Sequence, residues 1–408
     1  MKKVSIGITI GMMAITAAVT FIVTSNYNLK MFNDKIKSVN EKQEFYSKLS
    51  EIDTYVRTHH ITDIDEIVLI EGMVSGYISG VGDKYAEYIT AEEYAKRAAA
   101  ETGVTDGLGF KYEKEPGGYI KITEVIEGSS AEESGLMAGD IITAVNNTDV
   151  IAFAGGYEEA VSLFICAEGT RVKLYIKRTL EDKSSEFITY DVISRRTENI
   201  TVYGRLIENI GYIRISAFND KTEAQLKAKL DELISGGAGG LVFDLRGNTG
   251  GSVANLEKCL DHILGSGDIV TAEYKNGTSK VIVSCTEAEK IKMPMSVMVN
   301  NATAGTAELF AFALRDNAAA HTIGKTTAGK GYIQSDYICS DGSVVKLSTA
   351  IVKTSGSDNF DGIGLKPEFD VTISEEVDIF NISAEAALIS DTQLIKALEV
   401  TIPDEDED

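Results

Sequence analysis

The chain has 408 residues, enough for two domains and additional segments, because single domains usually contain about 100–200 residues. Its formal net charge of -23 argues against a nucleic-acid partner, since phosphate binding requires clustered Lys and Arg side chains. The same charge disfavours adhesion to anionic lipid headgroups, so any contact with a membrane must be hydrophobic.

The N-terminal segment carries the first clear pattern. An uncharged run, Val4–Ser25, is rich in Ile, Val, Met, Ala and Thr and follows Lys2-Lys3. A helix needs about 20 such residues to cross the hydrocarbon core of a bilayer. A cleaved signal peptide is the alternative, but the apolar run continues past the small residues that could form a cleavage site. We therefore predict an uncleaved signal anchor, a transmembrane helix, over residues 1–25.

Residues 26–100 are predicted to form a helical N-terminal region. Leu, Ile, Val and Tyr recur there at steps of three and four residues amid Lys and Glu, which is the period of an amphipathic helix. Glycines between Gly72 and Gly82 then predict a transition from helix to loop. Several lysines follow the anchor, so the charge pattern does not fix which side of the membrane the N-terminus faces.

The next stretch, residues 103–180, is predicted to be a small β-rich domain. Short runs of alternating apolar and polar residues, such as Val172–Ile176, are typical of strands. A fragment of a β-sandwich with glycine turns is the plain interpretation of this composition.

Two motifs in this stretch are more specific. The first, Gly107-Leu108-Gly109-Phe110, predicts a tight loop whose backbone N–H groups converge and can hold the terminal carboxylate of a peptide. The second, Gly128–Ile142, contains a short helix, a Gly-Leu turn and a Gly-Asp pair that opens a strand. Together they resemble a PDZ domain, with the turn Asn146-Asn147 at the place of a PDZ hairpin. The resemblance implies that polypeptide C-termini bind here as an added strand, with an apolar last residue.

The second half of the chain alternates strands and helices, which indicates an α/β layer architecture. The apolar runs Ile210–Ile215, Gly240–Leu245 and Met295–Val299 are predicted strands. Helices are predicted over 221–235 and Val253–Leu264. We assign residues 195–375 to this core and residues 376–408 to a C-terminal helix and an acidic tail.

A glycine-rich turn follows the second of these strands, in the sequence Asp244-Leu245-Arg246-Gly247-Asn248-Thr249-Gly250-Gly251. A strand that ends in a glycine turn before a helix exposes free N–H groups, and such groups can stabilise an oxyanion. A simple tight turn or an anion-binding nest would explain the same residues. The sequence resembles the Asp-Leu-Arg-x-Asn-x-Gly-Gly motif of carboxyl-terminal processing, or tail-specific, serine peptidases.

This resemblance extends over residues 72–399 and implies a peptidase core of the ClpP/crotonase-like class with an inserted PDZ domain. In the family, the catalytic serine lies three residues before a Glu that corresponds to Glu308, and that position is Gly305 here. The downstream block Gly324–Gln334 matches the family without an insertion, so the register holds. The resemblance assigns Thr306 a backbone N–H in the oxyanion site, together with Gly250 or Gly251.

Lys330 corresponds to the general base of the family. An ordinary Lys has a pKa of about 10.4, and apolar burial can lower this pKa enough for the amine to accept a proton from a serine. If residues 330–334 form a strand, Lys330 and Gln334 share one face, and Gln334 could orient the amine. Glycine at 305 has no nucleophile, and the hydroxyls of Thr303 and Thr306 are displaced from the required position.

Two functions are therefore open. One is a membrane-anchored serine-type peptidase that cuts proteins near C-termini captured by its PDZ domain. The other is a catalytically inactive pseudopeptidase that binds such tails as a scaffold or sensor. The family resemblance places the bulk of the chain outside the cytoplasm and leaves homo-oligomers open. The scattered cysteines and histidines predict no metal site, and no cofactor is expected. The four cysteines allow either disulfides or free thiols.

Overall fold

The computed structural model describes residues 43–402 except 127, 181, 288–290, 358 and 374–389, together with a few positions between 20 and 31. Most of the predicted transmembrane segment and the acidic tail therefore lie outside the described residues. Among the helices that are described, none is both long and apolar enough to cross a bilayer. The chain divides into two units, residues 1–76 and 77–408, and each is considered by itself.

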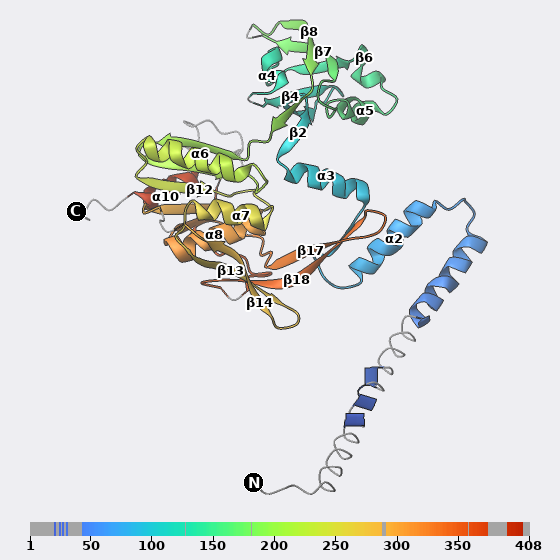
Figure 1. The fold of residues 1–408 in the computed structure, drawn as a ribbon. Helices are drawn as coiled ribbons and strands as arrows, with labels where there is room; N and C mark the ends of the chain where they lie inside the picture. Colours follow the sequence, from blue (N-terminus) through green and yellow to red (C-terminus); the bar gives the residue numbers. More distant parts are fainter. Residues whose placement is uncertain are drawn as a thin grey trace, which may run out of the picture. The chain divides into compact units, whose positions relative to one another are not determined.

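The N-terminal region is largely helical, as predicted (Figure 1). Residues 43–59 form one helix, and α2 (Glu66–Ser79) and α3 (Ala91–Glu101) follow. A short strand, β1 (Glu87–Ile89), interrupts the helices, because it pairs with residues 344–346 in the C-terminal half of the chain. The helical prediction for residues 26–100 is therefore wrong at this strand.

The β-rich domain is built on a six-stranded antiparallel sheet in the order β3-β4-β5-β7-β8, with β6 on β5. Its elements are β3 (Phe110–Lys114), β4 (Ile120–Val125), α4 (Ser130–Ser134), β5 (Ile141–Val145), β6 (Thr148–Asp149), α5 (Gly156–Ser162), β7 (Arg171–Thr179) and β8 (Ser185–Ile193). The predicted end of this domain, residue 180, lies between β7 and β8. Because these two strands pair along their whole length, the sheet continues beyond the predicted boundary to Ile193.

Local signals in this domain have the predicted effect. Ser129 caps α4 by accepting a hydrogen bond from the Glu132 N–H group, and Gly135 ends the helix in the left-handed conformation. Asn146 and Asn147 both have positive φ, as the tight turn between β5 and β6 requires.

The C-terminal half of the chain, after the β-rich domain, contains a six-stranded sheet in the order β10-β11-β12-β15-β16-β19. Only β10 is antiparallel to its neighbour. Its strands are β10 (Val202–Ile207), β11 (Ile210–Ile215), β12 (Gly240–Asp244), β15 (Met295–Val299), β16 (His321–Gly324) and β19 (Phe369–Asp370). Its helices are α6 (Thr222–Ser235), α7 (Val253–Asp261), α8 (Thr306–Ala318) and α10 (Thr392–Thr401). The predicted strands and helices are confirmed, although α7 ends before Leu264.

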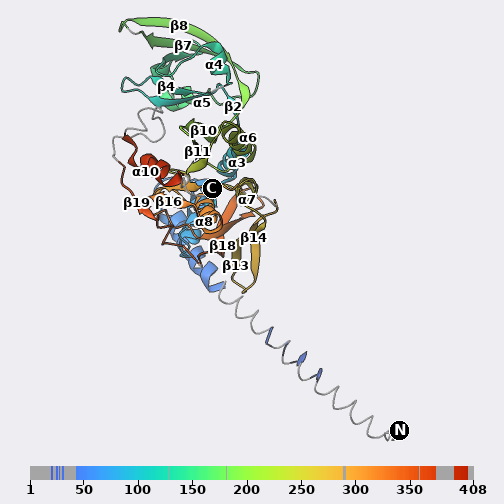
Figure 2. The same cartoon turned by 90° about the vertical axis from the view of Figure 1, so that its left-hand side faces the viewer.

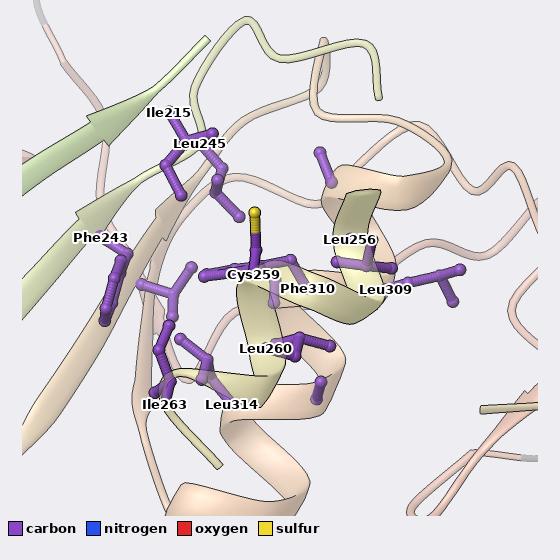
Figure 3. Packing of buried hydrophobic residues seen from close by; sticks show 14 of the residues in the cluster. Ile215, Phe243, Leu245, Leu256, Cys259, Leu260, Ile263, Leu309, Phe310 and Leu314 are labelled. Atoms are coloured by element: carbon purple, nitrogen blue, oxygen red, sulfur yellow. The ribbon is translucent and has the colours of Figure 1, made fainter. Parts of the chain in front are cut away.

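Both faces of this sheet are covered, which explains why β12 is buried throughout. Phe243 of β12 packs on Phe310 of α8 with ring centroids 5.4 Å apart, among side chains of α7 such as Cys259 (Figure 3). On the other face, Val242 packs with Leu394 of α10, the helix that lies beside β16 (Figure 2). The four cysteines are free thiols in the structure.

A second sheet has the order β1-β18-β13-β14, with β17 also paired to β18. Its longer strands are β13 (Gly267–Tyr274), β14 (Ser279–Cys285), β17 (Tyr332–Ile338) and β18 (Val344–Thr354). Because β1 pairs with β18, the segment that precedes α3 is held next to β17 and the loop before it. Two short strands, β2 (Val104–Gly107) and β9 (Arg195–Glu198), pair where the chain enters and leaves the β-rich domain.

Candidate active site

The glycine loop after β12 forms the first wall of the site. Gly250 and Gly251 have φ of 104° and 148°, and a Cβ atom on Gly251 would lie 2.2 Å from the Phe218 carbonyl oxygen, so both positions require glycine. The Gly250 N–H group donates to the Asn248 side chain at 2.8 Å. The Gly251 N–H group has no acceptor among the described residues. Of the two predicted glycine donors, Gly251 is therefore the one available to an oxyanion.

The second wall is the turn that leads into α8. A Cβ atom on Gly250 would lie 3.1 Å from the Thr306 nitrogen, so the turn and the glycine loop are in direct contact. Thr306 is the first residue of α8, and its N–H group has no partner in the part of the chain that the structure describes. This N–H group and that of Gly251 are the two donors from which an oxyanion site could be built.

Neither threonine hydroxyl lies at the nucleophile position. Thr303 is fully buried, and its hydroxyl donates to the Leu245 carbonyl oxygen at 2.9 Å while accepting from the Asn300 N–H group. The Thr306 hydroxyl is directed at the Gly251 carbonyl oxygen, 3.4 Å away. The hydroxyl of Thr303 is thus part of the framework of the turn, and that of Thr306 faces the glycine loop.

Gly305 itself has φ 60° and ψ -120°, a conformation that side chains with a Cβ atom rarely adopt. A Cβ atom built there would lie 3.8 Å from Cδ of Lys330 and 3.9 Å from the Thr249 carbonyl oxygen, and would meet nothing closer. A side chain at position 305 would therefore fit, and it would point toward the lysine. The structure places these two predicted site residues together.

Glu308 joins the turn to the lysine segment. Its fully buried carboxylate accepts hydrogen bonds from the N–H groups of Gly305, Gly329 and Lys330 at 2.7–2.9 Å, and from the Thr327 hydroxyl. The sequence comparison with the family gave Glu308 no role beyond marking the position of Gly305, so these hydrogen bonds were not predicted. The available signal was the position of a Glu three residues after a helix N-cap, as in a capping box.

Lys330 is half-buried, and its surroundings lower its pKa. Burial is the largest cause, and the ammonium group of Lys346 adds to it, whereas Glu87 and Glu308 act in the opposite direction. The predicted direction of the shift is therefore confirmed. A lower pKa raises the fraction of neutral amine near neutral pH, as a general base requires.

The predicted arrangement of Gln334 is wrong. The strand β17 begins at Tyr332, after Lys330, and its pairing shifts register between Ile333 and Gln334. The side-chain amide of Gln334 donates to the Tyr85 carbonyl oxygen at 2.6 Å, and no bond to Lys330 is formed. The shift removes the strict alternation on which the prediction depended. What faces the ammonium group of Lys330 instead is the ring of Tyr85, with 5.5 Å between nitrogen and ring centroid.

The predicted peptide-binding loop lies at the start of β3. The Leu108 N–H group donates to the Phe164 carbonyl oxygen at 3.3 Å, whereas that of Gly109 has no acceptor within the described ranges. Gly109 has φ 89°, and a Cβ atom there would collide with Ser129. Phe110 packs edge-on against Phe164. Because β3 is an edge strand, its outer side is open to an added peptide strand.

Comparisons with known proteins agree with this arrangement. Residues 209–371 match peptidase family S41, and residues 121–178 match the PDZ domain. The carboxy-terminal processing protease CtpA of Bacillus subtilis (strain 168) is 31% identical over 356 residues, which cover 87% of this chain and 74% of that protein. A carboxy-terminal-processing protease of Bartonella bacilliformis is 28% identical over 343 residues, covering 82% and 77%.

A solved photosystem II D1 C-terminal processing protease is 23% identical, with a TM-score of 0.45 and coverage of 79% of this chain and 86% of that one. The S41 match contains the glycine loop, α8 and Lys330, and the similarity to the Bacillus protein also includes the PDZ domain. The chain therefore belongs to the carboxyl-terminal processing serine peptidases of family S41 and carries a PDZ domain.

Proposed function

We propose that this chain binds polypeptide C-termini through its PDZ domain and presents them to a Ser/Lys-type site that cannot form an acyl-enzyme, because Gly305 occupies the nucleophile position. In this proposal the protein is a pseudopeptidase, a tail-binding scaffold or sensor. The predicted anchor over residues 1–25 would hold it in the cell membrane with the bulk of the chain outside the cytoplasm. Protease treatment of intact cells, with degradation of the chain only outside the membrane, tests the topology.

One observation carries the proposal: the hydroxyls of the two threonines that flank Gly305 in the sequence are directed elsewhere. The Thr303 hydroxyl is bonded to the Leu245 carbonyl oxygen, and that of Thr306 faces the Gly251 carbonyl oxygen. Covalent catalysis requires a nucleophile within about 3–3.5 Å of the scissile carbonyl carbon. A turn that moved either hydroxyl to that place would lose contacts that now hold it together.

Peptide-bond cleavage is the competing function. It is favoured by the lowered pKa of Lys330 and by the N–H groups of Gly251 and Thr306, which have no acceptor among the described residues. Both features serve a serine peptidase and are of no evident use to a protein that only binds. The same features predict that a single hydroxyl at position 305 would complete the site.

The test compares the full-length chain in detergent with Gly305→Ser, Lys330→Ala and the double variant. The substrates are unstructured polypeptides with apolar C-termini, and amidated versions serve as the control for tail recognition. We expect the unaltered chain to bind only the free carboxylate form and to leave it intact, because a backbone nest recognises the negative charge. Gly305→Ser is expected to cleave, and the double variant to lose at least about 100-fold of that activity.

Cleavage by the unaltered chain that disappears in Lys330→Ala would overturn the pseudopeptidase assignment and establish the peptidase function. Equal binding of free and amidated polypeptides would remove the tail-binding part of the proposal. Binding is read by fluorescence anisotropy and cleavage by mass spectrometry of the products, so the two parts are judged separately.

A further inference from the structure

A residue in the segment between α2 and β1, Tyr85, faces the lysine of the candidate active site. The site as described above gives this segment no role. We call residues 83–89 the strap. Its first residue, Asp83, accepts hydrogen bonds from the N–H group and the hydroxyl of Ser348 at 2.8 and 3.0 Å. Its last three residues, β1, pair with β18. The strap is thus fixed at both ends to the strand that lies beside β17.

Tyr85, in the middle of the strap, is hydrogen-bonded to three residues outside the strap through its hydroxyl and its backbone carbonyl. Its hydroxyl lies 3.0 Å from the Gly329 carbonyl oxygen and 2.8 Å from a carboxylate oxygen of Asp361, and its single proton can be donated to either acceptor. Its backbone carbonyl accepts from the side chain of Gln334. These bonds join it to the residue before Lys330, to the facing loop and to β17. The position of the ring is therefore determined by the same segments that carry the lysine.

The Tyr85 ring faces the end of the lysine side chain. The ammonium nitrogen lies 5.5 Å from the ring centroid. A cation–π interaction at this distance favours the charged amine, whereas exclusion of water favours the neutral one, and burial has the largest effect on the pKa of Lys330. No hydrogen bond or ion pair to this ammonium group is formed by any residue that the structure describes. Water and the Tyr85 ring therefore solvate the ammonium group of Lys330, and the ring covers one side of this group from water.

Three charged groups also act on Lys330, one from each neighbouring element. They are Lys346 of β18, Glu87 of β1 and Glu308 of α8. Glu87 is paired with Arg97 and Lys346 with Asp336, at 2.7 and 2.9 Å. Glu308 is committed to four hydrogen bonds. Each of these three charged groups is thus already paired or hydrogen-bonded to another residue. Burial has the largest effect on the pKa of Lys330.

We propose that Tyr85 is a positioning residue for Lys330: its ring covers the amine from water, and its bonds to Gly329, Asp361 and Gln334 hold the ring in place. Gln334 then acts on the lysine indirectly, by holding the strap. The strap thereby adds residues 83–89 to the peptidase site. This inference rests on the assignment of Lys330 as the base of the proposed site, and it does not depend on whether the chain cleaves.

The test measures how the reactivity of Lys330 depends on pH in the full-length chain. Acetylation by trace acetic anhydride, quantified by mass spectrometry, follows the neutral amine, so the midpoint of rate against pH reports its pKa and the plateau its accessibility. The unaltered chain should show a midpoint below that of an exposed lysine. In Tyr85→Ala we expect the midpoint to move upward and the plateau to rise, because water now reaches the amine.

Two variants serve as controls. Tyr85→Phe keeps the ring but loses the hydroxyl bonds that help to hold it, so its midpoint should lie between that of the unaltered chain and that of Tyr85→Ala. Tyr88→Ala removes a ring from the same strap that does not contact Lys330, and it should leave both midpoint and plateau unchanged. An unchanged or lower midpoint in Tyr85→Ala would overturn the proposal, and so would an equal upward shift in Tyr88→Ala.

A measurement on the chain with Tyr85 intact keeps the proposal testable if Tyr85→Ala does not fold. With carbon-13 lysine, the ε-methylene signal of Lys330, identified by its loss in Lys330→Arg, should be displaced by the ring current of Tyr85. A signal at the ordinary position would overturn the proposal. In the Gly305→Ser background, Tyr85→Ala should also lower kcat about 10-fold and shift the pH–rate profile upward. Failure of Gly305→Ser to cleave would count against the proposed function and leave the acetylation result unaffected.

Discussion

Gly305 combines an open space with a backbone conformation that disfavours any side chain. The adjacent carboxylate of Glu308 accepts from its N–H group, as in half of a capping box, but glycine cannot supply the other half. A serine would bring a hydroxyl toward Lys330, and it would have to adopt φ near 60°. Strain of this kind costs of the order of 1–3 kcal/mol and persists where the surrounding structure enforces it.

The first prediction at this scale concerns stability. Gly305→Ser and Gly305→Ala should each lower the free energy of unfolding by about 1–2 kcal/mol, because both introduce a Cβ atom at positive φ. The midpoint of urea unfolding, followed by circular dichroism, measures the change. Gly267→Ala is the control, since a Cβ atom at Gly267 meets open space and its φ is ordinary. Equal stability of Gly305→Ser and the unaltered chain would show that the turn relaxes around the new side chain.

At the scale of the elements, a buried ionic network joins the glycine loop to the C-terminal helix. The Arg246 guanidinium donates to Asp244 at 2.6 and 2.9 Å and to Asp391 at 2.8 and 3.1 Å, and all three side chains are almost completely buried. Asp391 also caps α10. Burial by itself would raise the pKa of Asp244, but Arg246 and Arg214 outweigh it and hold the pKa below its usual range.

Removal of the arginine should therefore be costly. We expect Arg246→Met to lower the free energy of unfolding by about 3–5 kcal/mol, because it removes the buried ion pair of Asp391 and leaves Asp244 with Arg214 as its ion-pair partner. Arg195→Met is the matched control: its ion pair with Glu133 is exposed, and its loss should cost less than about 1 kcal/mol. Hydrogen exchange should show the amides of α10 opening in Arg246→Met. A cost as small as that of the control would mean that the network contributes no net stability.

At the scale of the whole molecule, the PDZ domain and the domain of peptidase family S41 have separate hydrophobic cores. Side chains from Leu108 to Val192 form one core, and the sheet with its helices forms the others. The entering and leaving chains are paired through β2 and β9. A domain with its own core and adjacent termini is expected to fold independently.

Expression of fragments tests this expectation. Residues 103–199 should unfold in one cooperative transition, which should also be present in calorimetry of the full chain. Residues 103–180, the boundaries predicted from the sequence, should not fold stably, because they lack β8, its pairing with β7 and the buried side chain of Val192. A stable, cooperative 103–180 fragment would show that β8 is dispensable.

The sequence determined most of the architecture and of the site, because these features rest on local chemistry. Hydrophobic period predicted the strands from Ile210 to Val299, and turn and cap residues such as Gly135 and Asn146 predicted their own conformations. The resemblance to the tail-specific peptidases identified Gly305 and Lys330 as site residues, and in the structure a Cβ atom at position 305 would lie 3.8 Å from Cδ of Lys330.

Only the tertiary structure decided how the lysine is held. The bulge in β17 turns Gln334 away from Lys330, and pairing of β1 with β18 brings Tyr85 from a distant part of the chain onto it. The commitment of the Thr303 hydroxyl to Leu245 and of the Glu308 carboxylate to four donors also depends on contacts across the fold. Spacing in a sequence reports what lies within a turn or a strand, whereas these contacts exist only once separate elements have packed together.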